Sequence, residues 1–228
     1  MSERKNYRWY IGGEHKYDLM GAMQFNLLTA LGLRDYHKLL DIGCGSLRAG
    51  RLFIPYLNPG CYCGIEPEKW LVEEGIKNEI GSSLIQVKSP RFEFCDSFPI
   101  ASFGEKFNFM LAHSIFTHAS QEQILKCLKN VKQSLALSSD DMRGGILVAT
   151  VLLGEDDYQG SEWLWPGKTK TGFAYYTKEC IQRLAQESDL KCKFINWTHT
   201  HGQNWLIFGH TNEDVDTISD SPVHNYSI

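Results

Sequence analysis

The sequence lacks several features that would place it in a class at once. Its longest apolar run, Ile146 to Leu153, has the length of a strand and falls well short of the roughly 20 residues that cross a membrane. It has no long run of lysine and arginine, and its 228 residues carry a net charge of only -4. Because nucleic-acid binding usually needs a basic surface that displaces counterions from phosphates, the sequence favours neither a membrane nor a nucleic acid as partner.

The seven cysteines include no Cys-x-x-Cys pair, the spacing from which zinc sites usually draw their ligands. Cys61 and Cys63 alternate along one apolar segment, which predicts buried thiols on one face of a strand. The number of cysteines is odd and no secretory signal opens the chain, so we expect a reducing, cytoplasmic compartment, no disulfides and no metal site.

What is present is an ordinary globular composition, with 43% hydrophobic and 12% aromatic residues. The length predicts a single domain over residues 1–228 with one core. Within it we expect an N-terminal arm or lid at residues 1–17. A long aromatic segment at 154–176 is too long for a mere connection and predicts a substrate lid, and the acidic tail at 212–228 predicts a peripheral segment.

Helical periodicity and short apolar segments alternate along the chain. Helices are expected at residues 18–33, 47–57, 68–80, 121–137 and 177–188, and strands at 38–42, 62–66, 92–95, 107–113, 145–153, 192–197 and 204–210. The last two strands are joined by a short polar loop that reads as a hairpin. The pattern predicts an α/β fold: a Rossmann-like, mostly parallel seven-stranded sheet with helices on both faces and a C-terminal antiparallel hairpin.

A glycine turn follows the first expected strand, in the segment KLLDIGCGSLRAG at residues 38–50. Gly43 and Gly45 allow positive φ angles and let a ligand approach the backbone. Glu66, about 20 positions further on, would end the second strand, where an acidic residue accepts hydrogen bonds from ribose hydroxyls. A dinucleotide site needs a third glycine where this chain has Arg48, whereas a cationic sulfonium nucleoside suits an acidic residue at the turn, which Asp41 supplies.

From about Asp18 to His210 the sequence resembles the class I S-adenosylmethionine-dependent methyltransferases. The resemblance rests on LLDIGCGSLRAG, YCGIEP, FEFCDSF and FNFMLAHSIFTH, although Leu47 replaces the usual third glycine of the methyltransferase turn. It implies S-adenosylmethionine as cofactor and a set of residues that bind it. The implied residues are Asp41, Gly43 and Gly45 at the methionine end, Glu66 at the ribose, Pro67, Cys95, Asp96 and Ser97 at the adenine, and Ala112 and His113 beneath the sulfonium.

Methyl transfer from a sulfonium is an in-line displacement, so strong acid catalysis is unnecessary. A hydroxyl or amine acceptor benefits from a base, and the histidines after the fourth strand, His113 and His118, are the candidates. The same histidines also suit packing and capping roles, and His199 and His201 are secondary candidates. Magnesium-dependent methyltransferases of the catechol type need carboxylates at the fourth strand end, where this chain has Ala112 and His113, so we expect no metal.

Aromatic side chains in the arm and in the 154–176 segment are the expected acceptor contacts, with hydrophobic cover for the sheet as the alternative role. These candidates are His15, Tyr17, Trp163, Trp165, Tyr175 and Tyr176. The sequence thus predicts methyl transfer to an oxygen or nitrogen of a small molecule. An NAD-linked oxidoreductase and a non-catalytic nucleoside-binding protein are the alternatives.

Overall fold

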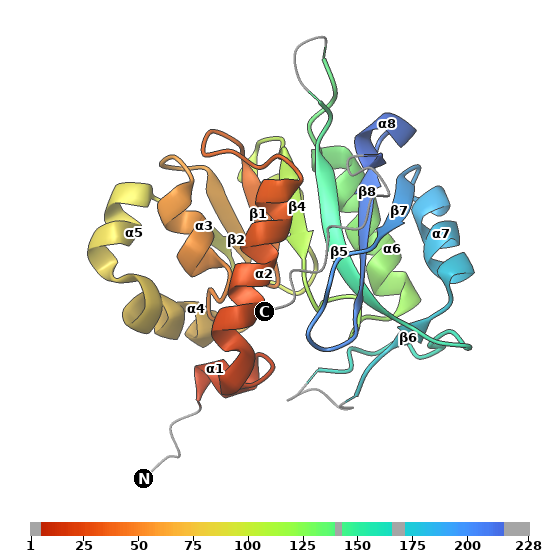
Figure 1. Cartoon of the computed structure of the whole chain (residues 1–228), viewed down its shortest axis with the longest axis horizontal. Helices are drawn as coiled ribbons and strands as arrows, with labels where there is room; N and C mark the ends of the chain where they lie inside the picture. The colour runs from red at the N-terminus through yellow and green to blue at the C-terminus, as the bar shows by residue number, and fades with distance from the viewer. Residues whose placement is uncertain (1–5, 140–142, 166–171, 217–228) are drawn as a thin grey trace. The chain divides into compact units, whose positions relative to one another are not determined.

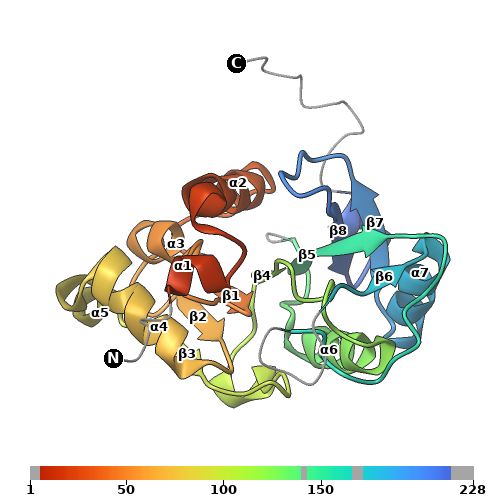
Figure 2. The same ribbon diagram turned by 90° about the horizontal axis from the view of Figure 1, so that it is seen from below.

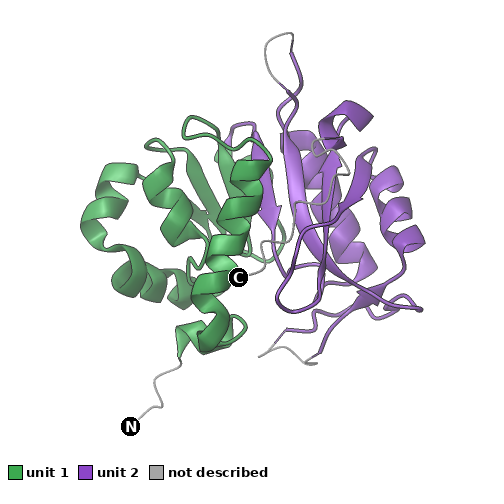
Figure 3. Ribbon diagram, in the orientation of Figure 1, with its two compact units in different colours: residues 1–103 green, residues 104–228 purple. Residues whose placement is uncertain are grey.

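The computed structural model describes residues 6–139, 143–165 and 172–216, which fall into two compact units, Met1–Phe103 and Gly104–Ile228 (Figure 3). The expected arm, lid and tail therefore lie in part outside the described residues. The expectation of one domain stays a prediction, and each unit is described by itself below.

Three parallel strands form the sheet of the first unit in the order β3-β2-β1. They are β1 (Leu39–Ile42), β2 (Tyr62–Ile65) and β3 (Arg91–Glu93) (Figure 1). Every residue of β1 and β2 is buried, as expected for parallel strands that are covered on both faces. Because the strands are parallel, the segments that follow them emerge at the same edge of this sheet.

Helices of the first unit pack around these strands. The longer ones are α2 (Tyr17–Ala30), α3 (Gly50–Tyr56), α4 (Lys69–Gly75) and α5 (Ser82–Lys88); the short ones are α1 (Tyr7–Tyr10), η1 (Glu14–Lys16), the π turn η2 (Ile76–Ile80) and η3 (Ile100–Phe103). α2 and α3 lie side by side (Figure 2). α4 continues directly into η2, so the helix expected at 68–80 is an α-helix that widens into a π turn.

In the second unit the strand order is β4-β5-β8-β7, and a short strand β6 pairs with the end of β5. The strands are β4 (Phe109–Ala112), β5 (Ile146–Leu153), β6 (Tyr175–Tyr176), β7 (Lys191–Ile195) and β8 (Asn204–Gly209). β4 and β5 are parallel, whereas β8 runs antiparallel to both β5 and β7. The predicted C-terminal antiparallel hairpin is therefore confirmed.

Two amphipathic helices, α6 (Gln121–Ser134) and α7 (Lys178–Glu187), pack side by side in this unit, and a short helix α8 (Asn212–Val215) follows β8. α6 begins with a capping box, in which the Ser120 hydroxyl accepts from the backbone of Gln123 and the Gln123 side chain accepts from the backbone of Ser120. None of the helices among the described residues combines the length and apolarity of a membrane span.

The α/β fold class is confirmed: strands that are mostly parallel, surrounding helices and a terminal hairpin. Each of the seven expected strands has a counterpart, and β6 is an additional short one. The sequence did not predict α5, because none of its residues is buried and it therefore has no apolar stripe to detect. β6 was also not predicted, because its two residues are too few to show the alternation that is typical of a strand.

Candidate functional site

The glycine turn after β1 is fastened to the neighbouring strand by backbone hydrogen bonds. The amides of Gly43 and Cys44 both donate to the carbonyl of Ile65, at 2.8 and 3.1 Å. Gly43 and Gly45 have φ angles of 74° and 55°, in the left-handed region that glycine adopts without strain. The turn therefore has the local conformation that its glycines predict.

Leu47 has a φ of 61° although it is not glycine. This is the residue that replaces the third glycine of the methyltransferase turn, so the left-handed conformation is retained with a bulkier side chain. Leu47 is fully buried, and its side chain approaches Gly50 and Gly75, whose missing Cβ atoms leave room for it. Packing of the leucine side chain offsets the backbone strain, which costs about 1 kcal/mol or more for such a residue.

Glu66, directly after β2, joins the two strand ends. Its Oε2 accepts a hydrogen bond from the amide of Gly45 at 2.9 Å, and its Oε1 accepts one from the amide of Glu68, also at 2.9 Å. Burial raises the pKa of Glu66 to about 7, and the two amide bonds oppose that rise. The structure thus brings Glu66 and the glycine turn into direct contact.

Asp41, the second predicted acid, lies within β1 and is buried. Its Oδ2 accepts a hydrogen bond from the hydroxyl of Tyr62 on β2, at 2.8 Å. Burial raises its pKa to about 6, whereas the Tyr62 hydrogen bond and the charge of Arg48 act in the opposite direction. Two buried carboxyl groups with raised pKa values therefore lie at this end of the first unit's sheet.

These raised pKa values predict how the stability of the ligand-free protein depends on pH. A carboxyl group whose pKa is higher in the folded than in the unfolded chain stabilises the fold at low pH and loses that contribution as the pH rises. The pKa of Glu66 rises from 4.5 to about 7 on folding. We therefore expect the free energy of unfolding to fall between about pH 4.5 and pH 7, by on the order of 3 kcal/mol from this group.

Urea unfolding at several pH values across this window measures the effect in the wild type and in Glu66→Gln. The substitution removes the titrating group, so the slope of stability against pH should flatten, whatever the substitution does to stability at any single pH. Equal slopes in the two proteins would contradict the raised pKa of Glu66.

The residues predicted to contact the adenine ring of the cofactor follow β2 and β3. Asp96 and Pro67 are exposed, and Cys95 is half-buried. The hydroxyl of Ser97 lies 2.9 Å from the Cys95 sulfur, and this hydrogen bond lowers the pKa of the Cys95 thiol. Glu66 and β3 are adjacent, because the amide of Glu66 donates to the carbonyl of Glu93 at 3.0 Å. Apart from Asp41, which lies within β1, the predicted cofactor residues of the first unit thus follow strands that end at one sheet edge.

The N-terminal arm lies against the glycine turn. The buried Tyr17 donates a hydrogen bond from its hydroxyl to the carbonyl of Ser46, at 3.0 Å. Arg48 donates to the carbonyl of Ile11 at 2.8 Å, and a Cβ added at Gly45 would lie 3.2 Å from Cγ2 of Ile11. Tyr17 therefore supports the turn, and its predicted contact with an acceptor stays a prediction, as does that of His15 in η1.

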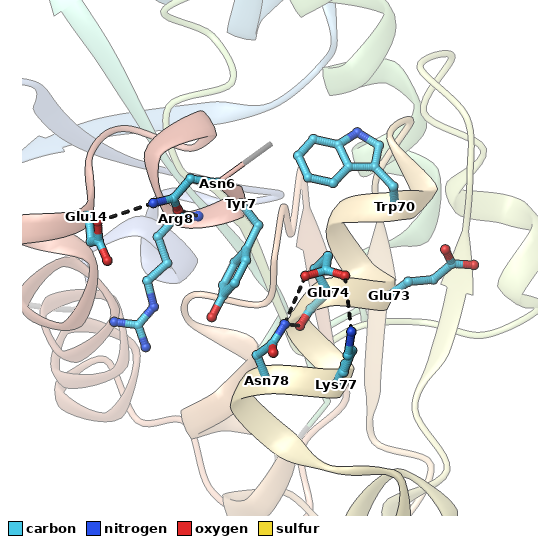
Figure 4. A pocket seen from close by; sticks show the side chains of 9 residues that line it. All are labelled: Asn6, Tyr7, Arg8, Glu14, Trp70, Glu73, Glu74, Lys77 and Asn78. Carbon is cyan, nitrogen blue, oxygen red and sulfur yellow. Dashed lines mark hydrogen bonds and ion pairs between the residues drawn. The ribbon is translucent and has the colours of Figure 1, made fainter. Parts of the chain in front are cut away.

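A pocket of about 830 Å³ opens between the arm and the α4–η2 segment (Figure 4). Its lining residues are Asn6, Tyr7, Arg8, Glu14, Trp70, Glu73, Glu74, Lys77 and Asn78. Arg8 contacts Glu79 at 2.7 Å, and Lys77 pairs with Glu74, so cations and anions of this region largely offset one another. The pocket includes none of the residues predicted to bind the cofactor.

In the second unit, Ala112 ends β4 and His113 follows it, both buried. Nε2 of His113 lies 2.9 Å from Nε2 of His199, which belongs to the loop between β7 and β8. The indole of Trp205 lies beside both imidazoles, with ring centroids 5.4 and 5.6 Å away. The two histidines thus form a pair that the sequence did not predict.

His118 is held by the aromatic segment. Its Nδ1 donates to the carbonyls of Leu164 and Gly172, at 3.0 and 2.9 Å, and burial lowers its pKa. The rings of Trp165 and Phe173 lie 4.8 and 5.1 Å from its own. Both described parts of the predicted substrate lid, 154–165 and 172–176, are therefore hydrogen-bonded to His118.

The remaining aromatic candidates differ in exposure. Tyr176 is fully buried and donates from its hydroxyl to the carbonyl of Ala119, whereas Tyr175 is 47% exposed. Trp163 is half-buried. Of these, Tyr176 supports the strand ends, while Tyr175 and Trp163 keep surface that a ligand can reach.

Sequence reasoning missed three partners that become visible only in the folded structure. Tyr62 was not predicted as the partner of Asp41, and Ile11 was not predicted to cover Gly45. Gln203, which makes two hydrogen bonds with Ser114, was also missed. All are distant in sequence from their partners, and no local pattern indicates such pairs.

Comparison with solved structures gives the fold. The chain aligns over 91% of its length with a SAM-dependent methyltransferase from Leishmania major, at a TM-score of 0.62 and 15% identity, covering 78% of that protein. The chain has the class I methyltransferase fold. An amino pentose methyltransferase from Micromonospora echinaspora, solved with bound SAM, shares this class I fold at a TM-score of 0.60 and 14% identity, covering 92% of this chain and 100% of that one.

The pyocyanin biosynthetic protein PhzM also shares the class I fold, with a TM-score of 0.59 and 14% identity. The alignment covers 85% of this chain but only 55% of PhzM, so the chain spans little more than half the length of that protein. No protein-family model matches the sequence. A search of curated proteins likewise found no matching sequence.

Proposed function

We propose that this protein is an S-adenosylmethionine-dependent methyltransferase that transfers a methyl group to an oxygen or nitrogen of a small-molecule acceptor. One observation carries the proposal: the hydrogen bond from the amide of Gly45 to Glu66, which joins the glycine turn to the acid that follows β2. The turn and the acid are the two parts that a nucleoside site requires in one place.

The residues present fit this cofactor. Gly43 and Gly45 give the turn the left-handed conformation that a nucleoside-binding turn needs, and Ile11 of the arm covers Gly45 on the side where a Cβ would lie. Asp41 and Glu66 are buried carboxyl groups with raised pKa values, and a nearby positive charge would favour their ionised forms. In the proposed site Asp41 lies at the methionine end and Glu66 accepts from the ribose, while Asp96 lies at the adenine.

The bound cofactor would supply a methyl group on a sulfonium, which is activated without an acid. The protein's part is to align the acceptor with that methyl group and to exclude water. His118 has the tautomer that a general base needs, because its Nδ1 proton is held by two carbonyl oxygens and Nε2 carries the lone pair. His118 is buried and has a lowered pKa, so it is neutral near pH 7.

Two observations support a small acceptor. Trp165 and Phe173 surround His118 with flat apolar surface, on which a ring or sugar can stack. The amino pentose methyltransferase with the same fold acts on a sugar, according to its description. The proposal includes no nucleic-acid or membrane partner, and it places the protein in the cytoplasm, where its seven free thiols would stay reduced.

The geometry at Arg48 supports this proposal over an NAD-linked oxidoreductase. Arg48 stands where a dinucleotide fingerprint has its third glycine. Its side chain is buried just before α3 and donates a hydrogen bond to the carbonyl of Ile11. The dinucleotide fingerprint needs a glycine at this position for close packing of helix and strand.

Calorimetry with S-adenosylmethionine and with NAD, followed by transfer of labelled methyl groups to a panel of small hydroxyl and amine compounds, tests the proposal. We expect S-adenosylmethionine to bind, NAD not to bind, and a subset of the panel to become labelled. Binding without transfer to any compound would favour a non-catalytic nucleoside-binding protein. Binding of NAD in its place would overturn the proposal.

A further inference from the structure

The pair formed by His113 and His199 has defined hydrogen-bond directions. Nδ1 of His199 accepts hydrogen bonds from the amides of His201 and Gln203, at 3.1 and 3.3 Å. An amide N–H can only donate, so Nδ1 of His199 must carry a lone pair. The proton of the neutral His199 ring is therefore on Nε2.

This proton determines the state of His113. The Nε2 atoms of the two rings are 2.9 Å apart, a distance at which one must donate and the other accept. Because His199 donates, Nε2 of His113 holds the lone pair, and the proton of its neutral ring is on Nδ1. A third proton on the pair would either place two N–H groups face to face, if it were on Nε2 of His113, or break the amide bonds to Nδ1 of His199.

The loop that carries His199 is fastened to the turn that carries His113. The hydroxyl of Ser114 and the side chain of Gln203 exchange two hydrogen bonds, at 3.1 and 2.8 Å. The amide of Ser114 donates to the hydroxyl of Thr150 on β5 at 2.8 Å. Ser114 has a φ of 60°, a strained conformation for a residue with a side chain, and such strain is retained where surrounding contacts fix it.

Trp205 closes the pair from the side of β8. It is 1% exposed, and its indole lies against both imidazoles. The planes of the two imidazoles differ by only 22° and their centroids are 5.1 Å apart, so turning either ring would break the contact between the Nε2 atoms. Reorientation of one imidazole would therefore disturb the packing of the other.

We propose that His199 is a positioning residue that holds His113 as the neutral Nδ1–H tautomer, with its Nε2 occupied. With its proton on Nδ1 and its Nε2 engaged, His113 does not act as a general base. Its role in the site rests on the proposed methyl transfer. There the fixed imidazole would form part of the wall of the site, while proton removal is left to His118.

Two-bond ¹H–¹⁵N correlation spectra of protein labelled with ¹⁵N-histidine test this proposal near pH 8, with His113 assigned by its loss in His113→Gln. We expect His113 to be protonated at Nδ1 and His199 at Nε2 in the wild type. His199→Phe removes the donor, and the proton of His113 should shift toward Nε2. His199→Gln places an amide N–H near the position of the original Nε2 and should restore the wild-type tautomer.

His201→Gln is the matched control, because it changes a neighbouring histidine whose ring is 6.2 Å from that of His199 but keeps the backbone amide that bonds it. It should leave the tautomer of His113 unchanged. A wild-type His113 protonated at Nε2 would overturn the proposal, and so would a tautomer that His199→Phe does not alter. If His199→Phe does not fold, the wild-type spectrum alone decides.

The spectroscopic result does not depend on methyl transfer, so failure of the proposed function leaves it interpretable. If the wild type does transfer methyl groups, the turnover number should fall in His199→Phe and recover in His199→Gln. Full turnover in His199→Phe, together with an altered tautomer, would remove His113 from the reaction and keep only the structural part of the inference.

Discussion

Replacing Glu66 by alanine should weaken S-adenosylmethionine binding by about 1–3 kcal/mol, or roughly 5- to 150-fold in the dissociation constant. The carboxylate is 7% exposed and directed at the glycine turn, so ribose hydroxyls would lose a charged acceptor that water replaces poorly. Alanine also leaves the amides of Gly45 and Glu68 without their acceptor, which loosens the turn. Isothermal titration calorimetry at about pH 8, where Glu66 is mostly ionised, measures the loss.

Glu66→Gln separates the charge of the side chain from its size and hydrogen-bonding capacity, because it keeps one oxygen acceptor and the side-chain volume but removes the charge. We expect it to bind with intermediate affinity. Glu73→Gln is the matched control: this glutamate lies on α4 and its side chain is 60% exposed. The assignment of Glu66 fails if Glu66→Ala binds as tightly as the Glu73 variant.

Replacing Gly75 by alanine should destabilise the fold by about 3 kcal/mol. The added Cβ would lie 2.2 Å from the carbonyl oxygen of Ser46 and 2.6 Å from its carbonyl carbon. Both atoms belong to the backbone, so no side-chain rotation relieves the overlap. The carbonyl of Ser46 also accepts from Tyr17, and a shift of the turn would weaken that bond.

Urea unfolding measures the effect, with Gly172→Ala as control. A Cβ at Gly172 meets no described atom within 4 Å, and its φ is not positive, so the control should change stability by no more than about 0.5 kcal/mol. A Gly75→Ala protein that is still folded should also bind S-adenosylmethionine more weakly, because Ser46, whose carbonyl would be displaced, directly follows Gly45 in the glycine turn. Wild-type stability in Gly75→Ala would show that α4 can move away from the turn at little cost.

Local patterns predicted the elements that have a clear apolar pattern. The strand before the glycine turn and the helix after Ser120 were both found, because the first is apolar at three of its four buried positions and the second has a capping box and an apolar stripe. α5 has neither, and the two residues of β6 are recognised only by pairing with Leu152 and Leu153. The residues of α5 and β6 therefore carry too little local information to predict these two elements from the sequence.

The same limit applies to the site. Spacing along the chain predicted that Glu66 would follow the second strand, and the structure brings it to Gly45. The partners of these residues come from other strands and loops: Tyr62 reaches Asp41 from the next strand, and His199 lies 86 positions from His113. Such pairs are determined by register and by loop packing, which a single sequence does not encode locally.

Both carboxylate oxygens of Glu66 accept hydrogen bonds from backbone amides of the chain itself, so internal contacts fix this edge of the proposed pocket. A ribose would then donate to the remaining lone pairs of a carboxylate that is already held in place. Preorganisation of this kind lowers the entropic penalty of association, and it leaves more of the contact energy available as affinity.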